Sequence, residues 1–209
     1  VEQGAFAEAE TLFRQNIEEM PDMAMHHGNL AMLFLIEERY LEALTEYREA
    51  YRLDSAELAY FLPLAEVELV AGKRENAKVV LETAVTSGVE DWDVLGLLSS
   101  IYFEDGNYDA ALPLFLNLVS RAPDNLEARM HLGILYAMKK DWRLSEEHLA
   151  PVVSAGDVEA LEQVGFLYGQ VLSRLGRCKE AKITLERFGQ GSSRELIDST
   201  LKDCSASSR

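Results

Sequence analysis

The stretch WDVLGLLSSIYFEDGNYDAALPLFLNLVSRAPDN, from Trp92 to Asn125, decides the fold of this chain. Its first half places apolar or small residues at offsets of 0, 3, 4 and 7, namely at Leu95, Leu98, Ser99 and Tyr102. Residues with these offsets share one face of an α-helix, whose period is about 3.6 residues. The spacing therefore predicts an amphipathic helix in the first half of the stretch.

The second half of the stretch predicts a turn followed by another helix. Gly106 and Asn107 interrupt the first pattern, and an asparagine is a favourable N-cap for the helix that follows. Ala111 and Phe115 then form a second apolar stripe, and Pro123 closes the unit because proline restricts the residue before it. We therefore predict a helix–turn–helix unit of 34 residues.

Three columns of residues recur at this spacing through most of the chain, with one shift of two residues before the last repeat. The turn column is Gly4, Glu38, Gly72, Gly106, Lys140 and Gly176. The small column is Ala9, Ala43, Ala77, Ala111, Ser145 and Ala181. The large apolar column is Phe13, Tyr47, Leu81, Phe115, Leu149 and Leu185. A small residue beside a large one in every repeat predicts helix pairs that approach closely along a filled seam.

The unit resembles the tetratricopeptide repeat, in its length and in these positions. The resemblance implies an all-α fold, a right-handed superhelical solenoid of antiparallel helix pairs, in which helix A of each repeat lines a concave face. It covers roughly residues 1–190. Repeats contact mainly their neighbours, so the stability of such an array is approximately a sum of local contributions.

The predicted array begins with a half repeat that contains only the second helix. We expect the segment from Gly4 to be this helix, closed by Pro21, and we expect the natural protein to extend further N-terminally or to have lost that part. The array spans 1–190 and is followed by a capping helix and polar tail at 191–209; its parts are 1–23, 24–57, 58–91, 92–125, 126–159 and 162–190.

Several residues depart from the repeat pattern. Glu68 and Arg74 occupy positions where large apolar or aromatic residues prevail, and Pro63 lies inside a predicted helix. An interior proline costs about 3 kcal/mol unless the helix kinks or begins late. Pro151 is expected to end the second helix of its repeat early.

Composition and charge restrict the classes of partner. The chain has 209 residues, 48% of them hydrophobic, and a formal net charge of −16. Phosphate binding needs lysine and arginine, so nucleic acid and anionic membrane surfaces are not expected partners. No apolar run reaches the roughly 18 residues that span a bilayer, so no direct membrane insertion is expected.

Cysteines and histidines give no sign of a metal or catalytic site. Cys178 and Cys204 are too few for a disulfide framework, and we expect free thiols in a reducing compartment or simply buried. His26 and His27 point about 100° apart on a helix, so they cannot easily share a metal. We expect no catalytic residue, no cofactor and no enzyme activity; the cytoplasm is favoured, and the periplasm stays open because the first repeat is incomplete.

The family resemblance also implies which side chains line the ligand groove. Positions 2, 5, 6, 9, 12 and 13 of helix A, read onto this chain, place four of the six methionines in the groove. Methionine is common on surfaces that accept varied apolar partners, although a methionine stripe is also typical of ordinary packing between repeats. The predicted groove residues are Met25, Asn29, Met32, Leu35, Leu62, Glu66, Leu69, Phe103, Glu104, Glu127, Met130, His131, Ile134, Met138, Phe166 and Arg174.

Two hypotheses for function follow. The first is a non-enzymatic protein-interaction scaffold that binds an apolar or amphipathic peptide segment, with basic flanks selected by Glu66, Asp93, Glu104 and Glu127. The alternative is a self-assembling repeat module within a larger secretion, pilus or export assembly, associating through its open N-terminal end. A carboxylate clamp is disfavoured because Arg174 alone adds positive charge to the groove.

Overall fold

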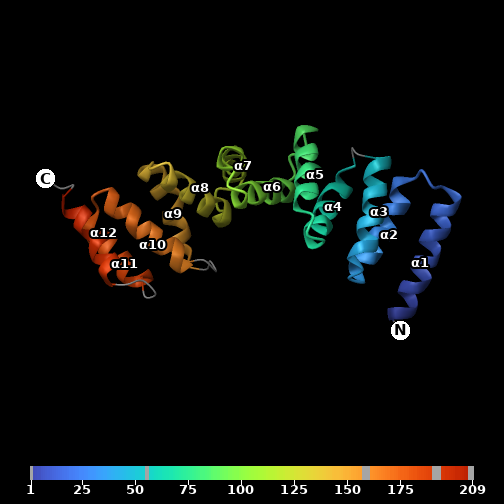
Figure 1. Cartoon of the computed structure of the whole chain (residues 1–209), viewed down its shortest axis with the longest axis horizontal. Helices are drawn as coiled ribbons and strands as arrows, with labels where there is room; N and C mark the ends of the chain where they lie inside the picture. The colour runs from blue at the N-terminus through green and yellow to red at the C-terminus, as the bar shows by residue number, and fades with distance from the viewer. Residues whose placement is uncertain (1, 55–56, 157–160, 190–193, 207–209) are drawn as a thin grey trace. The chain divides into compact units, whose positions relative to one another are not determined.

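The computed structural model describes residues 2–54, 57–156, 161–189 and 194–206, and the regular secondary structure in these ranges is helical throughout (Figure 1). The all-α prediction is therefore confirmed. The helices form two compact units, Val1–Ile101 (unit 1) and Tyr102–Arg209 (unit 2).

Unit 1 is a stack of neighbouring helices in which each packs against the next. The helix α1 packs against α2, α2 against α3, α3 against α4 and α4 against α5. Their bounds are α1 Glu2–Glu19, α2 Ala24–Ile36, α3 Tyr40–Leu53, α4 Leu58–Val70 and α5 Arg74–Thr86, and α6 (Trp92–Glu104) begins in this unit and ends in the next.

Unit 2 repeats the same plan. The pairs α8–α9 and α10–α11 pack closely, α10 also contacts α9, and the last helix lies against α10 and α11. The bounds are α7 Tyr108–Arg121, α8 Leu126–Met138, α9 Trp142–Ala155, α10 Leu161–Arg174, α11 Cys178–Phe188 and α12 Arg194–Ala206. Within the described residues, no helix combines the length and the hydropathy needed to cross a bilayer.

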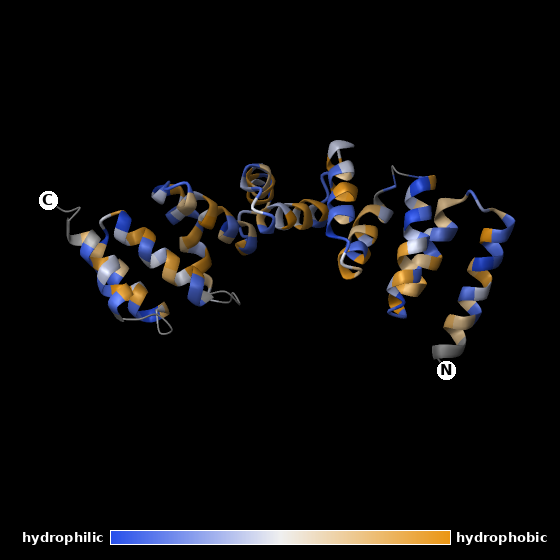
Figure 2. Ribbon diagram, viewed as in Figure 1, coloured by the Kyte–Doolittle hydropathy of each residue, from blue (hydrophilic) through white to orange (hydrophobic). Residues whose placement is uncertain are grey.

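The small and large columns form the seams between paired helices. From the second repeat onward the small column is fully buried, and the large column is at most 2% exposed. Close approach explains why: a Cβ on Gly133 of α8 would lie 2.4 Å from Cγ of Leu149 on α9. Ser145 also donates a hydrogen bond of 2.8 Å to the carbonyl oxygen of Gly133. Hydrophobic residues accordingly run along the paired helices (Figure 2).

The turn column adopts the left-handed conformation. Gly72, Gly106 and Gly176 have φ between 71° and 75°, and the non-glycine residues Glu38 and Lys140 have φ of 59° and 61°. A positive φ lets the chain leave one helix and enter the next within a few residues.

Gly4 breaks the rule, because it lies inside α1 rather than at a turn. The expected turn at this position is therefore wrong. A glycine inside a helix costs about 1 kcal/mol relative to alanine. The neighbouring Ala5 and Ala7 are strong helix formers and offset that cost.

Three prolines lie inside helices, and Pro151 does not end its helix as predicted. The helix α9 continues to Ala155 and stops at Gly156, whose φ is 74°. Val152 and Val153, which follow the proline, are buried in the apolar core of unit 2. Their burial holds the last turn of α9 in place despite the missing amide donor.

The third repeat replaces apolar contacts with polar ones. Glu68 is 2% exposed, and its carboxylate accepts hydrogen bonds from Arg48 (2.6 Å) and Asn76 (3.3 Å). Arg74, at the aromatic position, donates to the carbonyl oxygen of Ile101 over 3.0 Å. A buried carboxylate is tolerated only when it is paired in this way.

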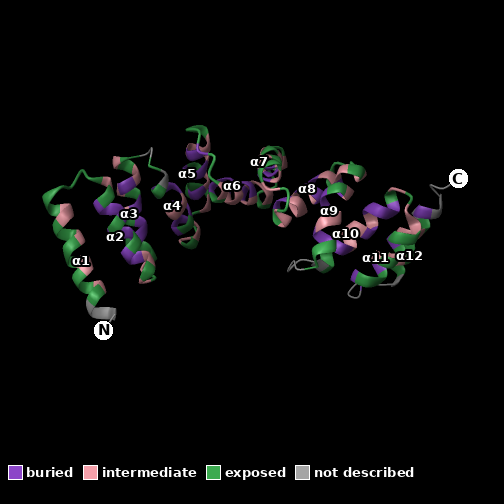
Figure 3. Ribbon diagram, turned by 180° about the vertical axis from the view of Figure 1, so that it is seen from behind, coloured by how far each residue is buried: buried purple, intermediate pink, exposed green. Residues whose placement is uncertain are grey.

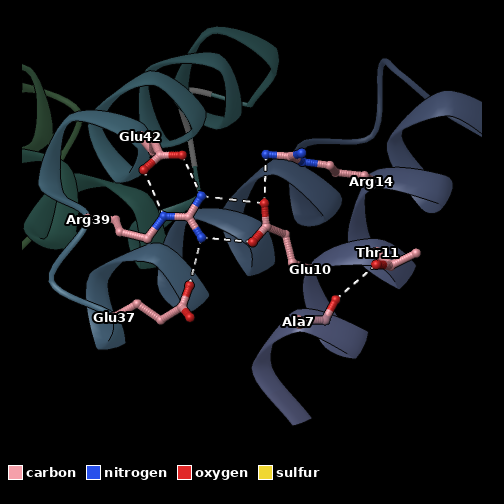
Figure 4. A network of polar contacts seen from close by, with 7 residues as sticks. All are labelled: Ala7, Glu10, Thr11, Arg14, Glu37, Arg39 and Glu42. Carbon is pink, nitrogen blue, oxygen red and sulfur yellow. Dashed lines mark hydrogen bonds and ion pairs between the residues drawn. The ribbon is translucent and has the colours of Figure 1, made fainter. Parts of the chain in front are cut away.

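A charged network holds α1 on the rest of unit 1 (Figure 4). Arg39, which precedes α3, donates to Glu10 of α1 (2.7 Å), to Glu37 (2.8 Å) and to Glu42 (2.7 Å). The hydrogen bond from this guanidinium lowers the pKa of the Glu10 carboxyl. Arg14 of α1 adds a second ion pair to Glu10 at 2.7 Å. All side chains of α1 from Ala5 onward are half-buried or exposed, in contrast to those of α2 (Figure 3).

The last helix is anchored covalently. Cys178, at the start of α11, and Cys204, near the end of α12, form a disulfide with a Cα–Cα distance of 5.6 Å. The expectation of free thiols is therefore wrong. The two cysteines are 26 residues apart in the sequence, and only the packing of α12 against α11 brings them together. Ser173 of α10 adds a hydrogen bond of 2.8 Å to the carbonyl oxygen of Thr200.

Candidate functional site

All of the predicted groove side chains are half-buried or exposed. Met25, Met32 and Met138 are 54%, 46% and 52% exposed, although methionines usually lie inside folded proteins. Residues beside them on the same helices, such as Leu30 and Leu132, are at most 2% exposed. The predicted positions therefore remain accessible for contact.

In unit 1 the predicted residues divide between two cavities. Met25 and Asn29 line a cavity of about 790 Å³ together with Tyr60 of α4. Leu62 lines a smaller one of about 340 Å³ with Val94 of α6. The structure places Met32 elsewhere: its sulfur accepts a weak hydrogen bond of 3.8 Å from the Tyr47 hydroxyl. Leu35 and Leu69 are half-buried.

The predicted residue Glu66 forms an acidic pair with Asp93 in unit 1. The Glu66 side chain is exposed, but nearby protein atoms partly remove water from its carboxylate. This desolvation is the main cause that raises the pKa of Glu66. Repulsion from Asp93 of α6 raises the pKa further. A basic group placed between Glu66 and Asp93 would relieve this repulsion.

In unit 2 the predicted residues Phe103 and His131 belong to an aromatic cluster. The His131 ring stacks on Phe115 with centroids 4.7 Å apart and meets Phe103 edge-on at the same distance. Burial lowers the pKa of His131, and its Nδ1 lies 2.9 Å from the carbonyl oxygen of Glu127. That geometry has Nδ1–H as the donor and keeps the neutral ring in place.

Three predicted residues of unit 2 line one cavity of about 560 Å³, namely Ile134, Met138 and Arg174. Its wall also contains Trp142 of α9 and Leu167 of α10, together with Leu196 of α12. The guanidinium carbon of Arg174 lies 6.0 Å from the centre of the Trp142 ring. An apolar cavity with a few polar groups at its rim is the usual form of a ligand site.

The remaining predicted residues of unit 2 do not enter this cavity. Met130 packs against the apolar core, so ordinary packing accounts for part of its surface. Phe166 is half-buried, and Glu104 and Glu127 are exposed.

The sequence missed the contributions of Trp142 and of α12. Trp142 begins α9, the second helix of its repeat, whereas the predicted groove residues all lie on helix A. The α12 residues follow the repeat period poorly and have no helix A numbering, so their place in the cavity depends on tertiary packing; they are Leu196, Ser199 and Thr200.

His27 and His148, which lie outside the aromatic cluster, each contact other side chains of their own unit. His27 lies 2.7 Å from a carboxylate oxygen of Glu46 and 3.0 Å from the carbonyl oxygen of Pro21. His148 stacks on Tyr136 with centroids 5.6 Å apart, and burial lowers its pKa. Among the residues that the structure describes, no three side chains of the ligand types form a metal-binding group.

Solved structures with the same fold are numerous, and no curated protein matches the chain. YrrB, described as a tetratricopeptide repeat protein with an unusual peptide-binding site, has a TM-score of 0.72 and 21% identity, over 88% of this chain and 94% of that one. MamA of AMB-1 has a TM-score of 0.68 and 19% identity, over 83% and 95%. A tetratricopeptide repeat protein from Parabacteroides merdae has a TM-score of 0.64 and 17% identity, over 98% and 94%.

Models of the tetratricopeptide repeat match most of the chain. One matches residues 1–57 and 62–118, and a second matches 102–164. These matches agree with the helix pairs, the left-handed turns and the buried small column described above. The chain belongs to the tetratricopeptide repeat family.

Proposed function

We propose that the chain is a non-enzymatic scaffold that binds an apolar or amphipathic segment of another protein through the predicted groove residues. The observation that carries the proposal is the accessibility of these side chains, three of which meet in the cavity of unit 2. The peptide-binding site named for YrrB, a structure of the same fold, supports this reading by analogy.

Binding would be driven by apolar burial in the cavity of about 560 Å³. Each Å² of apolar surface removed from water contributes about 25 cal/mol, so one leucine or phenylalanine side chain contributes about 2 kcal/mol. Met138 and Trp142 suit such an occupant, because methionine adapts its shape and tryptophan offers a wide flat surface.

A selection experiment tests the apolar cavity. A displayed library of random peptides is selected on the wild-type chain, and the selected peptides are measured on Met138→Glu plus Leu196→Glu. Both side chains are exposed and line the cavity, at 52% and 44%. We expect the peptides to be rich in aliphatic and aromatic residues. We expect them to bind the variant at least about tenfold more weakly, since each introduced carboxylate must lose its water when an apolar side chain covers it.

The matched control carries the same charge at exposed apolar sites outside the cavity, Leu116→Glu plus Ile183→Glu, which are 40% and 66% exposed in the wild type. We expect this variant to bind as the wild type does. Equal loss in both variants, or a library that yields no apolar peptides, would refute the proposal.

The basic flanks of the partner segment are a separate part of the proposal. Glu104 and Glu127 are exposed in unit 2 and would attract lysine or arginine beside the apolar anchor. Reversal to Glu104→Lys plus Glu127→Lys is expected to weaken a basic-flanked peptide and to flatten the dependence of its affinity on salt. An unchanged affinity and salt slope would remove the flanks from the proposal.

Self-association is the second candidate, and the surface of α1 favours it. Ala9 and Phe13 belong to the small and large columns, but they are half-buried, whereas their counterparts in the other repeats are buried. A second copy could cover this face. Sedimentation of the wild type and of Phe13→Glu tests it: a concentration-dependent dimer that the variant abolishes is expected, and a monomer at all concentrations rejects it.

The disulfide bears on the compartment. Disulfides persist in oxidising compartments and are rare in the cytosol, so the bond between Cys178 and Cys204 favours an extracytoplasmic location over the cytoplasm. Trapping of thiols in intact native cells with a mass-tagged maleimide tests this. Absence of labelling before reduction is expected, and two labels before reduction would place the chain in a reducing compartment.

A further inference from the structure

The cavity of about 790 Å³ in unit 1 differs in chemistry from the cavity of unit 2. It lies where residues 20–23, between α1 and α2, meet Asp54 and Glu57, which flank α4 on its N-terminal side. Three methionines and three carboxylates line it, and none of its described lining residues is a lysine or arginine; the six are Met20, Met23, Met25, Asp22, Asp54 and Glu57.

The wall formed by the α1–α2 connection is held in position. The carbonyl oxygen of Pro21, between Met20 and Asp22, lies 3.0 Å from Nε2 of His27. Nδ1 of the same ring lies 2.7 Å from a carboxylate oxygen of Glu46 on α3. The amide of Met23 also donates to the carbonyl oxygen of Met20 over 3.2 Å. Because these hydrogen bonds already fix the segment, it loses little conformational entropy when a ligand binds.

The position of Tyr60 in the lining of the cavity depends on a glycine. A Cβ on Gly28 of α2 would lie 2.5 Å from Cε1 of Tyr60, so the absence of a side chain lets the Tyr60 ring lie against α2. Tyr60 is only 8% exposed. This arrangement adds an aromatic side chain to the lining that contains the methionines.

The electrostatic field in the cavity is negative. Burial raises the pKa of the Tyr60 hydroxyl, and the charges of Glu57 and Asp54 raise it further. Arg52, whose charge interacts with Asp22, also pairs with Glu49 at 2.6 Å. A cation therefore gains more at this site than at the cavity of unit 2, whose lining contains Arg174 and no carboxylate among its described residues.

The methionines are exposed to an unusual degree. Met20, Met23 and Met25 are 45%, 42% and 54% exposed, so apolar surface and negative charge stand side by side. An occupant that satisfies both has an aliphatic side chain next to lysine or arginine. An acidic segment would be repelled by the carboxylates, and a purely polar segment would leave the methionine side chains exposed to water.

We infer that the unit 1 cavity is a docking site for a cationic segment of a partner protein, in which an aliphatic side chain enters among the three methionines and flanking lysines or arginines meet Asp22 and Glu57. The inference rests on the proposed scaffold function, for which it names the chemistry of one partner segment. The site is separate from the apolar cavity of unit 2.

The first test uses a short capped peptide with one leucine between lysines, and its affinity is measured by fluorescence anisotropy. The variant Asp22→Asn plus Glu57→Gln removes two charges from the cavity while keeping the shape of both side chains. We expect the affinity to fall about tenfold at low salt. The matched control, Asp124→Asn plus Glu147→Gln, removes the same charges from exposed positions of unit 2 and is expected to change the affinity by less than about twofold.

Two further peptides separate the parts of the inference. Replacement of the lysines by glutamates is expected to abolish binding, and replacement of the leucine by serine is expected to weaken it. Equal loss in the matched control, or equal binding of either altered peptide, overturns the inference.

The site itself is read from methyl spectra of ¹³C-methyl methionine, of which the chain has six. We expect the resonances of Met20, Met23 and Met25 to shift on addition of the lysine peptide. Shifts confined to Met130 and Met138 would overturn the inference but leave the proposed function standing. Absence of binding by this peptide, with library peptides still bound at unit 2, has the same meaning, whereas failure of both classes of peptide removes both proposals.

Discussion

Units 1 and 2 build the same helix pairs with different interior chemistry. Unit 1 places a carboxylate inside a seam, where Glu68 is paired with Arg48, and it ties α1 through the charges around Arg39. Unit 2 uses aromatic stacking at His131 and His148 and a disulfide at its end. The backbone geometry is the same because the small and large columns set the distance between helices in both units.

The difference shows that a buried seam accepts a polar side chain when neighbouring side chains supply its hydrogen bonds. Glu68 stands where unit 2 has Tyr102 and Tyr136, and the change is tolerated because Arg48 and Asn76 complete the carboxylate's hydrogen bonds. Four experiments sharpen this comparison.

The largest expected effect comes from breaking the charged seam of unit 1. Arg48→Met leaves the Glu68 carboxylate, which is 2% exposed, with Asn76 as its remaining side-chain partner. Loss of one partner of a buried ion pair costs about 3–5 kcal/mol, and we expect the lower end because Arg48 is itself 45% exposed. Urea denaturation followed by circular dichroism measures the loss.

The double variant Arg48→Met plus Glu68→Leu provides the control. It converts the position to the apolar type seen in the other repeats and is expected to recover most of the stability. A single variant as stable as the wild type would show that the pair does not hold the seam.

The next effect comes from the covalent anchor of unit 2. The disulfide closes a loop with a sequence separation of 26 residues. The chain-entropy relation for a loop of that length gives about 3.5 kcal/mol, of which residual structure in the unfolded chain removes a part. Cys178→Ser plus Cys204→Ala is expected to lower the melting temperature of unit 2 and to increase amide hydrogen exchange in α12. Unchanged exchange in α12 would mean that packing alone holds the helix.

The third effect is a loss of stability of unit 2 when its buried histidines are protonated at low pH. Burial lowers the pKa of His131 and His148 below the ordinary value of 6.5, so the unfolded chain binds protons more readily than the folded one. Their contribution to stability is fully present above pH 6.5 and is lost as the pH falls from there through the folded-state pKa.

Urea denaturation at stepwise lower pH tests this. We expect the midpoint for unit 2 to fall, and we expect His131→Phe, which keeps the stack on Phe115, to reduce the slope. A slope that does not change in His131→Phe would assign the acid sensitivity to other groups.

The smallest expected effect concerns the left-handed turn residues that are not glycine, Glu38 in unit 1 and Lys140 in unit 2. Glu38 and Lys140 hold φ near 60° without being glycine, at a strain of about 1 kcal/mol. Glu38→Gly and Lys140→Gly are each expected to stabilise the chain by about 0.5 kcal/mol, because relief of strain exceeds the added entropy of the unfolded chain. The melting temperature measures both, and a lower value in either variant would contradict the expected strain.

Sequence reasoning succeeded where the answer depends on local period. The offsets of Leu95, Leu98 and Tyr102 predict a helix, and a helix spans Trp92–Glu104. It failed at Gly4 and Pro151, where the neighbours of a helix-breaking residue outweigh its own preference. It also failed at Cys178 and Cys204, because spacing in the sequence does not report the distance between two packed helices.

Some residues of the candidate site could likewise be predicted from the sequence and others could not. Helix periodicity, together with the family resemblance, placed Met138 and Arg174 on one face, since both lie on helices with a common numbering. It could not place Leu196 beside them, because α12 follows the array outside that numbering. Nor could it find the unit 1 cavity, because half of its described lining residues lie between helices, outside that numbering.

The sequence by itself determined the repeat, the helix pairs and the family, because close packing of helices needs a small residue beside a large one at a fixed period. Only the tertiary structure decided which polar residues are satisfied in the interior, which cysteines are joined and which side chains share a cavity. These properties depend on distances between segments far apart in the chain, and one-dimensional spacing does not encode those distances.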